Sequence, residues 1–202
     1  GLVLPPKLAP VHVVIVPIYK NNDQLSVISE KAEKIKKLLS DKGLTVKYDN
    51  RDTHKPGWKF AEYELKGVPV RLAVGPNDIE NNTVELARRD TLQKQNYPQE
   101  GIEKVIVKLL DEIQAGIFKK ALDFREKNTY RTDDYEEFKH IMEDKGGFVL
   151  AHWDGTEKTE LRIKDETMAT IRCILLDSEQ EDGECILTGK PSKQRVLFAK
   201  AY

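Results

Sequence analysis

The sequence predicts an α/β domain with a mixed sheet, followed by a helical connector and a small α+β domain. A continuous apolar run at residues 11–17 (V-H-V-V-I-V-P) indicates a buried central strand. Residues 23–42 place apolar side chains at helical spacing and end at Gly43, where a helix C-cap is expected. Strand-like and helical segments then alternate as far as residue 113, a pattern typical of α/β proteins.

The other elements of the first domain follow in order. We expect a strand at 45–48, a short helix at 57–65, strands at 68–74 and 83–88, and a long amphipathic helix through 102–113. The turns at 51–57 and 75–78 lie beyond strand ends, where ligands of α/β sheets tend to bind. On the short helix, the sequence assigns Trp58 and Leu65 to packing and leaves Lys59, Phe60 and Glu64 to point elsewhere.

The second half of the chain is divided less clearly. Helical character continues past residue 116, and a further helix is expected at 135–142, before Gly146. Short apolar runs at 148–153, 170–176 and 195–199 indicate a small α+β domain, which at roughly 55 residues would benefit from a structural staple. The expected division is therefore a linker at 1–9, a first domain at 10–113, a connector at 114–145 and a last domain at 146–202.

Composition excludes several classes of protein. The net charge is −1, so no global basic field is available to hold long DNA, and we expect no DNA partner. Two cysteines give no disulfide framework, and no apolar run is long enough to span a membrane, so a cytoplasmic protein is expected. Motifs for a nucleophile elbow, a zinc protease, a P-loop or a dinucleotide site are missing.

Cations, carboxylates and aromatic rings are concentrated between residues 51 and 90. Within 51–71 there are five Lys or Arg residues against three Asp or Glu residues. Guanine presents acceptors to Arg or Lys and N–H donors to a carboxylate, and an aromatic ring can stack on it. Two unstacked guanines are therefore a natural ligand for this segment. The alternative reading is a solvated helix with charge pairs such as Glu62 with Lys66.

The segment G-W-K-F-x-E-x-E-L-K-G-V-P-V-R-x-x-V-G-P-N-D (57–78) resembles the anticodon-recognition segment of prolyl-tRNA synthetases of the archaeal and eukaryotic-like type. The first ten residues, G-L-V-L-P-P-K-L-A-P, and the last eight, R-V-L-F-A-K-A-Y, also resemble that family, in the part that follows the catalytic domain. The resemblance implies a class II anticodon-binding domain that recognises tRNA(Pro). It also implies a parent homodimer whose separate catalytic domain uses ATP and Mg²⁺, so this chain alone is not expected to be catalytic.

The resemblance implies a role for individual side chains. Phe60 would stack on an anticodon base, Glu64 would accept from guanine N–H groups, and Arg71 would hold guanine or phosphate oxygens. Lys59 would neutralise the anticodon backbone. Candidates of second rank are Arg51, Asp78, Arg88 and Asp90. The C-terminal Tyr202 would reach toward the catalytic domain.

Many members of this family hold zinc with four cysteines in the C-terminal domain. At the matching positions this chain has Asp154, Thr159 and Thr188, and Cys185 alone is retained. One thiolate with two hydroxyls does not make a tetrahedral zinc site. We therefore expect a zinc-binding-like domain that has lost its metal, and no cofactor in this chain.

Three other functions remain compatible with the residues. A freestanding nucleic-acid accessory protein could use the same fold, and a structural interaction module would bury the 51–71 face against another protein. A small-molecule enzyme would need a deep pocket with perturbed titratable groups. The missing catalytic motifs argue against this last function.

Overall fold

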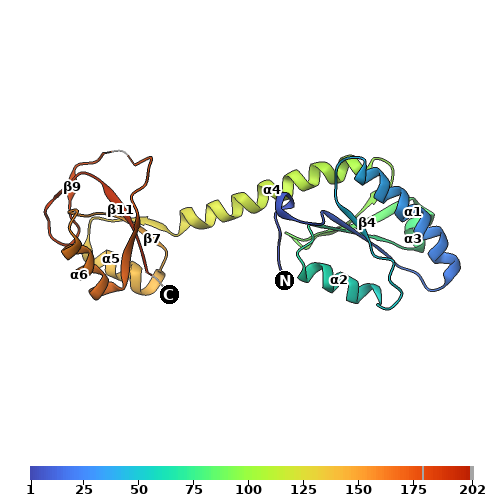
Figure 1. Ribbon diagram of the computed structural model, residues 1–202, viewed down its shortest axis with the longest axis horizontal. Helices are drawn as coiled ribbons and strands as arrows, with labels where there is room; N and C mark the ends of the chain where they lie inside the picture. Colours follow the sequence, from blue (N-terminus) through green and yellow to red (C-terminus); the bar gives the residue numbers. More distant parts are fainter. Residues whose placement is uncertain (179, 201–202) are drawn as a thin grey trace. The chain divides into compact units, whose positions relative to one another are not determined.

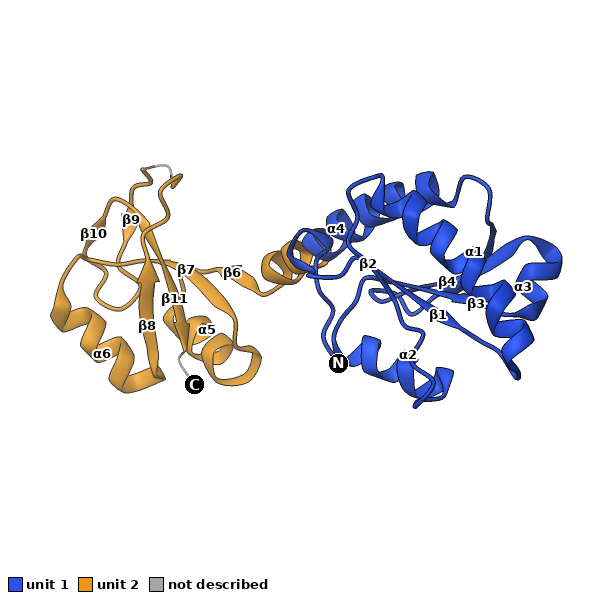
Figure 2. Cartoon of the chain, turned by 45° about the vertical axis from the view of Figure 1, so that its right-hand side comes forward, with its two compact units in different colours: residues 1–119 blue, residues 120–202 orange. Residues whose placement is uncertain are grey.

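The computed structural model describes residues 1–178 and 180–200, and the expectation for Tyr202 falls outside them. The chain forms two compact units, Gly1–Lys119 and Lys120–Tyr202 (Figure 2). Within the described residues, no helix is both long enough and apolar enough to cross a membrane.

The first unit is built on one mixed sheet with the strand order β2-β1-β3-β4-β5. The strands are β1 (Val13–Pro17), β2 (Val46–Tyr48), β3 (Val70–Val74), β4 (Thr83–Arg88) and β5 (Lys94–Pro98). β1 pairs parallel with β2 and β3, whereas β3–β4 and β4–β5 are antiparallel. β1 and β3 are buried along their whole lengths, as expected for central strands. β5 was not expected from the sequence.

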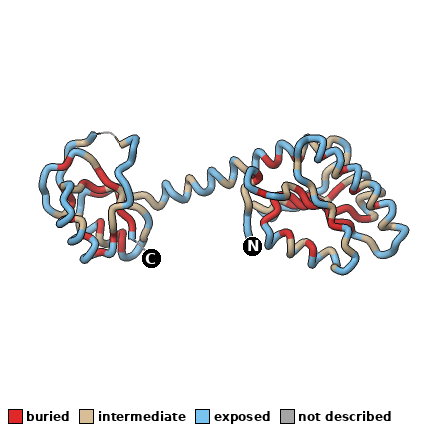
Figure 3. The backbone as a smooth tube through the Cα atoms, in the orientation of Figure 1, coloured by how far each residue is buried: buried red, intermediate tan, exposed pale blue. Residues whose placement is uncertain are grey.

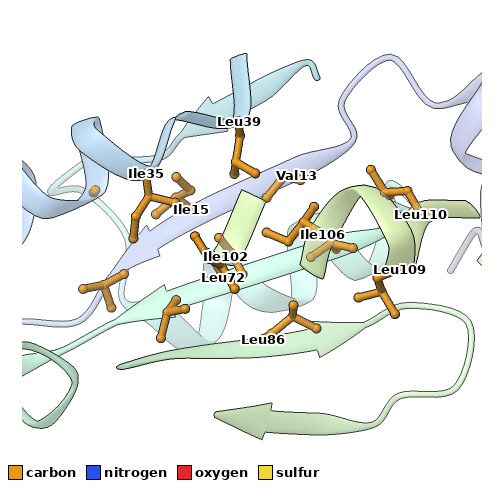
Figure 4. Packing of buried hydrophobic residues seen from close by; sticks show 14 of the residues in the cluster. Val13, Ile15, Ile35, Leu39, Leu72, Leu86, Ile102, Ile106, Leu109 and Leu110 are labelled. Atoms are coloured by element: carbon orange, nitrogen blue, oxygen red, sulfur yellow. The ribbon is translucent and has the colours of Figure 1, made fainter. Parts of the chain in front are cut away.

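Helices cover both faces of this sheet (Figure 1). They are α1 (Asn22–Ser40), α2 (Pro56–Leu65), α3 (Pro76–Asn81) and α4 (Ile102–Lys127). α1 and α4 pack on one face against Val13, Ile15 and Leu72, with Leu86 of β4 in the same cluster (Figure 4). α2 packs on the other face, where Tyr63 contacts the cluster of Val14 and Val16. Because neighbouring residues of β1 point to opposite faces, the strand is buried on both sides. Figure 3 shows buried residues gathered in the interior of each unit.

Two local expectations were wrong. Residues 75–78 are not an open turn: Gly75 is the N-cap of α3, and its N–H donates to Asp78 Oδ2 at 2.9 Å. Trp58 and Leu65 do not pack in the core, because they are 49% and 66% exposed. The buried residues of α2 are Lys59 and Tyr63, so the inward face is rotated from the expected one.

The second unit contains a four-stranded sheet in the order β6-β7-β11-β8. These strands are β6 (Thr129–Arg131), β7 (Phe148–His152), β8 (Ala169–Cys173) and β11 (Arg195–Lys200), and the short ribbon β9 (Gly183–Glu184) pairs with β10 (Pro191–Ser192). α5 (Tyr135–His140), a π-helical turn (Ile141–Lys145) and α6 (Glu157–Thr167) complete it. Phe138, Ile163 and Phe198 belong to its core. The segment expected as a connector, 114–145, thus comprises the end of α4, then β6, α5 and the whole π-helical turn.

Candidate nucleic-acid interface

A pocket lies between α2 and the strands β3, β4 and β5 of the first unit. Its volume is about 240 Å³. Four of the predicted site residues line it together: Phe60 and Glu64 from α2, Arg71 from β3 and Arg88 from β4. The other lining residues are Tyr63, Val68, Ala87, Arg89, Leu92 and Lys94.

Arg71 is the most unusual side chain in this pocket. It is only 5% exposed, and its guanidinium carbon lies 3.7 Å from the centre of the Phe60 ring, over the ring face. One nitrogen, Nη2, donates to Glu85 Oε1 at 2.9 Å, but Nε and Nη1 are buried without a hydrogen-bond partner. Buried guanidinium donors are normally satisfied, so two unpaired donors at a pocket wall indicate a place for an acceptor.

Other lining groups add charge of both signs. Arg88 is held by Asp90, whose two oxygens accept from Nε and Nη2 at 3.0 and 2.8 Å. Arg89 donates to the main-chain oxygens of Glu64 and Gly1. Within the part of the chain that the structure describes, the side chains of Glu64 and Lys94 make no hydrogen bond or ion pair. The pocket therefore offers one free carboxylate and one free ammonium group.

Lys94 was missed by the sequence analysis. It belongs to β5, a strand of exposed polar residues that shows no apolar alternation. Its pairing with β4 is antiparallel, with Lys94 opposite Ala87, and this pairing brings Lys94 to the pocket wall. The one sequence feature that could have predicted this placement is the short connection between residues 88 and 94, because a connection of that length is compatible with a hairpin.

The placement expected for Lys59 was wrong. Its side chain is 1% exposed and lies inside the unit, where Nζ donates to the main-chain oxygens of Asp49 and Arg51 at 3.0 and 2.5 Å. Nζ also lies 3.7 Å from Asp49 Oδ1. An ammonium with these partners holds the chain after β2 against α2, so it does not face an RNA backbone.

Arg51 belongs to the same group of charges. It donates to Asp49 through Nε and Nη2, and Nη2 also lies 2.5 Å from Glu62 Oε2. Tyr63 donates to Asp49 Oδ2 at 3.1 Å, which completes the set of partners around this buried carboxylate. We call Asp49, Arg51, Lys59, Glu62 and Tyr63 the Asp49 network.

Titration properties follow from this network. Burial opposes ionisation of Asp49, but hydrogen bonds from Arg51 outweigh it and hold the pKa of the carboxyl well below its usual range. Burial raises the pKa of Tyr63, and the neighbouring Asp49 charge raises it further. Burial lowers the pKa of Lys59, although the Asp49 charge opposes that change. Hydrogen bonds from Lys66 and Arg51 lower the pKa of Glu62.

Two other candidates have structural partners. Asp78 accepts from the Gly75 N–H and, through Oδ1, from Thr83 Oγ1 at 3.1 Å, so it fixes the start of α3 beside β4. Asp90 holds Arg88 at the pocket. Neither residue lines the pocket.

Three of the positions that correspond to zinc ligands in the resembling family, Asp154, Thr159 and Thr188, come together in the second unit. Asp154 Oδ2 accepts from Thr159 Oγ1 at 2.9 Å and from Thr188 Oγ1 at 3.1 Å, while Asp154 Oδ1 accepts from Thr156 Oγ1 at 2.8 Å. Burial raises the pKa of Asp154, but these hydrogen bonds outweigh it and leave the pKa below its usual value. Such a carboxylate–hydroxyl cluster lacks the thiolate and imidazole donors that zinc prefers. The absence of zinc stays a prediction.

Comparison with known proteins finds a matching family model in each of the two units. Residues 12–109 match the family model described as "Anticodon binding domain", and residues 135–202 match "Prolyl-tRNA synthetase, C-terminal". The chain is 64% identical to a protein of Porphyromonas gingivalis named proline–tRNA ligase. Proteins of the same name from Parabacteroides distasonis and Cytophaga hutchinsonii are 61% and 59% identical, and all three alignments cover the whole chain. The chain belongs to the prolyl-tRNA synthetase family.

This assignment confirms the resemblance and the expected fold class, a mixed-sheet class II anticodon-binding domain followed by a small C-terminal domain. The chain spans 41% of the length of these three relatives. Because one family model describes a prolyl-tRNA synthetase C-terminal domain at 135–202, the present chain corresponds to the C-terminal part of such a synthetase.

Proposed function

We propose that this chain recognises the anticodon of tRNA(Pro) as part of a prolyl-tRNA synthetase. The observation that carries the proposal is the pocket in which Phe60, Glu64, Arg71 and Lys94 meet. Proline anticodons end in two guanines, and guanine has both acceptors and donors on its edges. The unpaired N–H groups of Arg71 supply donors for O6 or N7, and the free carboxylate of Glu64 supplies an acceptor for N1–H and N2–H.

The size of the pocket favours one flat ligand. Its volume of about 240 Å³ is below the roughly 300–1,000 Å³ of pockets for drug-sized molecules. A single base would enter between the exposed Glu64 and Lys94 side chains and reach the buried Arg71 guanidinium. Lys94 and Arg89 would then lie near the phosphates that flank the base, and they would supply the salt-dependent part of the affinity.

The parent enzyme follows from this role. Its catalytic domain would attach proline to tRNA(Pro) with ATP and Mg²⁺, and the parent would act as a homodimer. Translation takes place in the cytoplasm, which is the compartment that the proposal implies. Residues 10–113 would read the anticodon, and residues 146–202 would form a C-terminal domain without zinc.

The direct test is binding of a proline anticodon stem-loop to this chain at fixed, moderate salt. A second stem-loop, with the two guanines changed to adenines, provides the specificity control. We expect preference for the guanine pair, and we expect Glu64→Gln and Arg71→Lys to reduce that preference. Glu30→Gln, an exposed change on α1, should leave it unchanged. Equal affinity for both stem-loops would contradict the proposal.

A further inference from the structure

The outward face of α2 carries an apolar stripe that the first unit covers only in part, through the His54 ring stacked on Trp58 at 3.7 Å. Trp58 and Leu65 are 49% and 66% exposed, and Ala61 between them is also exposed. Residues spaced three and seven positions apart lie on one side of a helix. Leu2, 58% exposed, extends this surface, because its N–H donates to Leu65 O at 3.0 Å. We call Leu2, Trp58, Ala61 and Leu65 the α2 stripe.

A solvent-facing helix surface is normally polar. α2 departs from this pattern. Its buried positions are Lys59 and Tyr63, whereas the side chains of Trp58 and Leu65 face outward. Scattered apolar side chains on a surface need no explanation, but several on one helix face are typical of an interaction site. Charged groups border the stripe: Glu62 pairs with Lys66 at 2.5 Å and with Arg51 at 2.5 Å. An apolar centre with a polar rim is the usual composition of a protein interface.

The main chain around Gly1 lies directly against the end of α2 (Figure 2). A Cβ added to Gly1 would meet Leu65 Cα at 2.6 Å. Arg89 Nη2 donates to Gly1 O at 3.1 Å, and Leu4 N donates to Gly67 O at 3.3 Å. These bonds fix the direction from which any preceding polypeptide reaches the first unit. Residues joined to Gly1 therefore have a high effective concentration at the α2 stripe.

The length of the relatives indicates which polypeptide could cover the α2 stripe. Each is more than twice as long as this chain, which covers 41% of their length, and the C-terminal family model matches residues 135–202. The additional polypeptide therefore precedes the position of Gly1. We propose that the α2 stripe is the docking surface for the part of the parent synthetase that precedes Gly1, through an apolar patch on that part. This inference rests on the proposed function only for the identity of the parent.

Cysteine labelling in the full-length parent tests the proposal. Leu65→Cys probes the stripe, and Leu38→Cys, 45% exposed on α1, is the matched control away from it. Each site is followed by peptide-resolved mass spectrometry during maleimide labelling, so native cysteines do not interfere. In the 202-residue chain both sites should react readily. In the full-length parent we expect Leu65→Cys to react at least about tenfold more slowly, since reaction then requires local opening of the interface, and Leu38→Cys to be unchanged.

Equal labelling of Leu65→Cys in the long and short chains would overturn the proposal. Protection that appears only when the anticodon stem-loop is added, to the same extent in both chains, would also overturn it and would assign the stripe to RNA. A second variant, Leu65→Glu, separates docking from anticodon reading. It should raise hydrogen exchange in α2 of the full-length parent to the level of the short chain, with the preference for the guanine pair retained. Unchanged exchange in that variant would count against docking, whereas failure of the anticodon proposal would appear in the stem-loop assay with the unaltered chain.

Discussion

The guanidinium carbon of Arg71 lies 3.7 Å from the centre of the Phe60 ring, over the ring face. Phe60 was expected to stack directly on an anticodon base. One face of the ring is covered by a buried cation that still has two unpaired donors, and stacking of a base on the ring stays a prediction. The two residues are therefore coupled: the Phe60 ring packs on the Arg71 guanidinium, whose Nε and Nη1 stay buried beside the pocket without a partner.

Phe60→Leu should weaken binding of the proline anticodon stem-loop. The substitution keeps apolar volume but removes the ring under Arg71, and a cation–π contact of up to about 2 kcal/mol corresponds to a loss of roughly 30-fold in affinity. Phe60→Tyr retains the ring and should bind nearly as the unaltered chain does. Titration of both variants with labelled stem-loop at constant salt measures the difference. Wild-type affinity in Phe60→Leu would show that the ring does not support recognition.

Lys59→Met should destabilise the first unit. The change removes the donor to the Asp49 and Arg51 oxygens and leaves the Asp49 carboxylate with less compensation. Breaking a buried ion pair from one side costs about 3–5 kcal/mol. Urea-dependent hydrogen exchange of amides in β1 and β3 measures this loss, and Lys55→Met at an exposed position is the control. Weaker stem-loop binding with unchanged exchange would instead place Lys59 in contact with RNA.

Lys59 also shows where prediction from sequence fails. Helical periodicity assigns charged side chains to solvent, so Trp58 and Leu65 were expected inside and Lys59 outside. The reverse orientation depends on Asp49, ten residues away, whose carboxylate and carbonyl compensate a buried ammonium. Periodicity contains no information about such a partner. By contrast, the apolar run of β1 predicted a central strand correctly, because both of its faces are buried by ordinary packing.

Only some of the residues that line the pocket were expected from the sequence. Phe60, Glu64, Arg71 and Arg88 do line one pocket, and a family motif identified the segment that carries three of them. Lys94 was missed because β5 is an exposed, polar edge strand, defined by its pairing with β4 and not by its own pattern. Arg51, Asp78 and Asp90 are charged, like the residues of the pocket, and were expected at the site for that reason. The structure shows instead that each is bound to a structural partner.

The first unit should lose stability in acid through Asp49. The folded-state pKa of this carboxyl lies below its unfolded value, which is about 3.9. Its contribution is therefore complete above that unfolded value and is lost as the pH falls toward the folded value. Stability measured from pH 6 down to pH 2, by exchange in β1, should decline below about pH 4.

Asp49→Asn provides the matched comparison for this pH dependence. The variant should be less stable at neutral pH, because an amide cannot accept the charged hydrogen bonds from Arg51 in the same way. Its decline in acid should also be shallower than that of the unaltered chain. Parallel pH profiles for the two proteins would show that other carboxyl groups govern the acid transition.

The last prediction concerns the Asp154 cluster. Asp154→Ala removes the acceptor for Thr159 and Thr188, and Thr159 is only 5% exposed, so its hydroxyl would lose a charged partner in a buried place. Hydrogen bonds to charged groups contribute about 1.5–3 kcal/mol each, and thermal unfolding of the second unit should shift to lower temperature. Asp165→Ala, at an exposed position of α6, should leave the transition unchanged.

Addition of a chelator tests whether the Asp154 cluster is held by hydrogen bonds alone or binds a metal ion. If hydrogen bonds to Asp154 replace zinc, addition of a strong chelator should leave the unfolding temperature of the second unit unaltered, and added Zn²⁺ should not raise it. Elemental analysis of the purified protein gives an independent reading. A fall in unfolding temperature on chelation, reversed by Zn²⁺, would mean that Asp154 and Cys185 contribute to a metal site. In that case the loss of stability in Asp154→Ala would be a loss of metal.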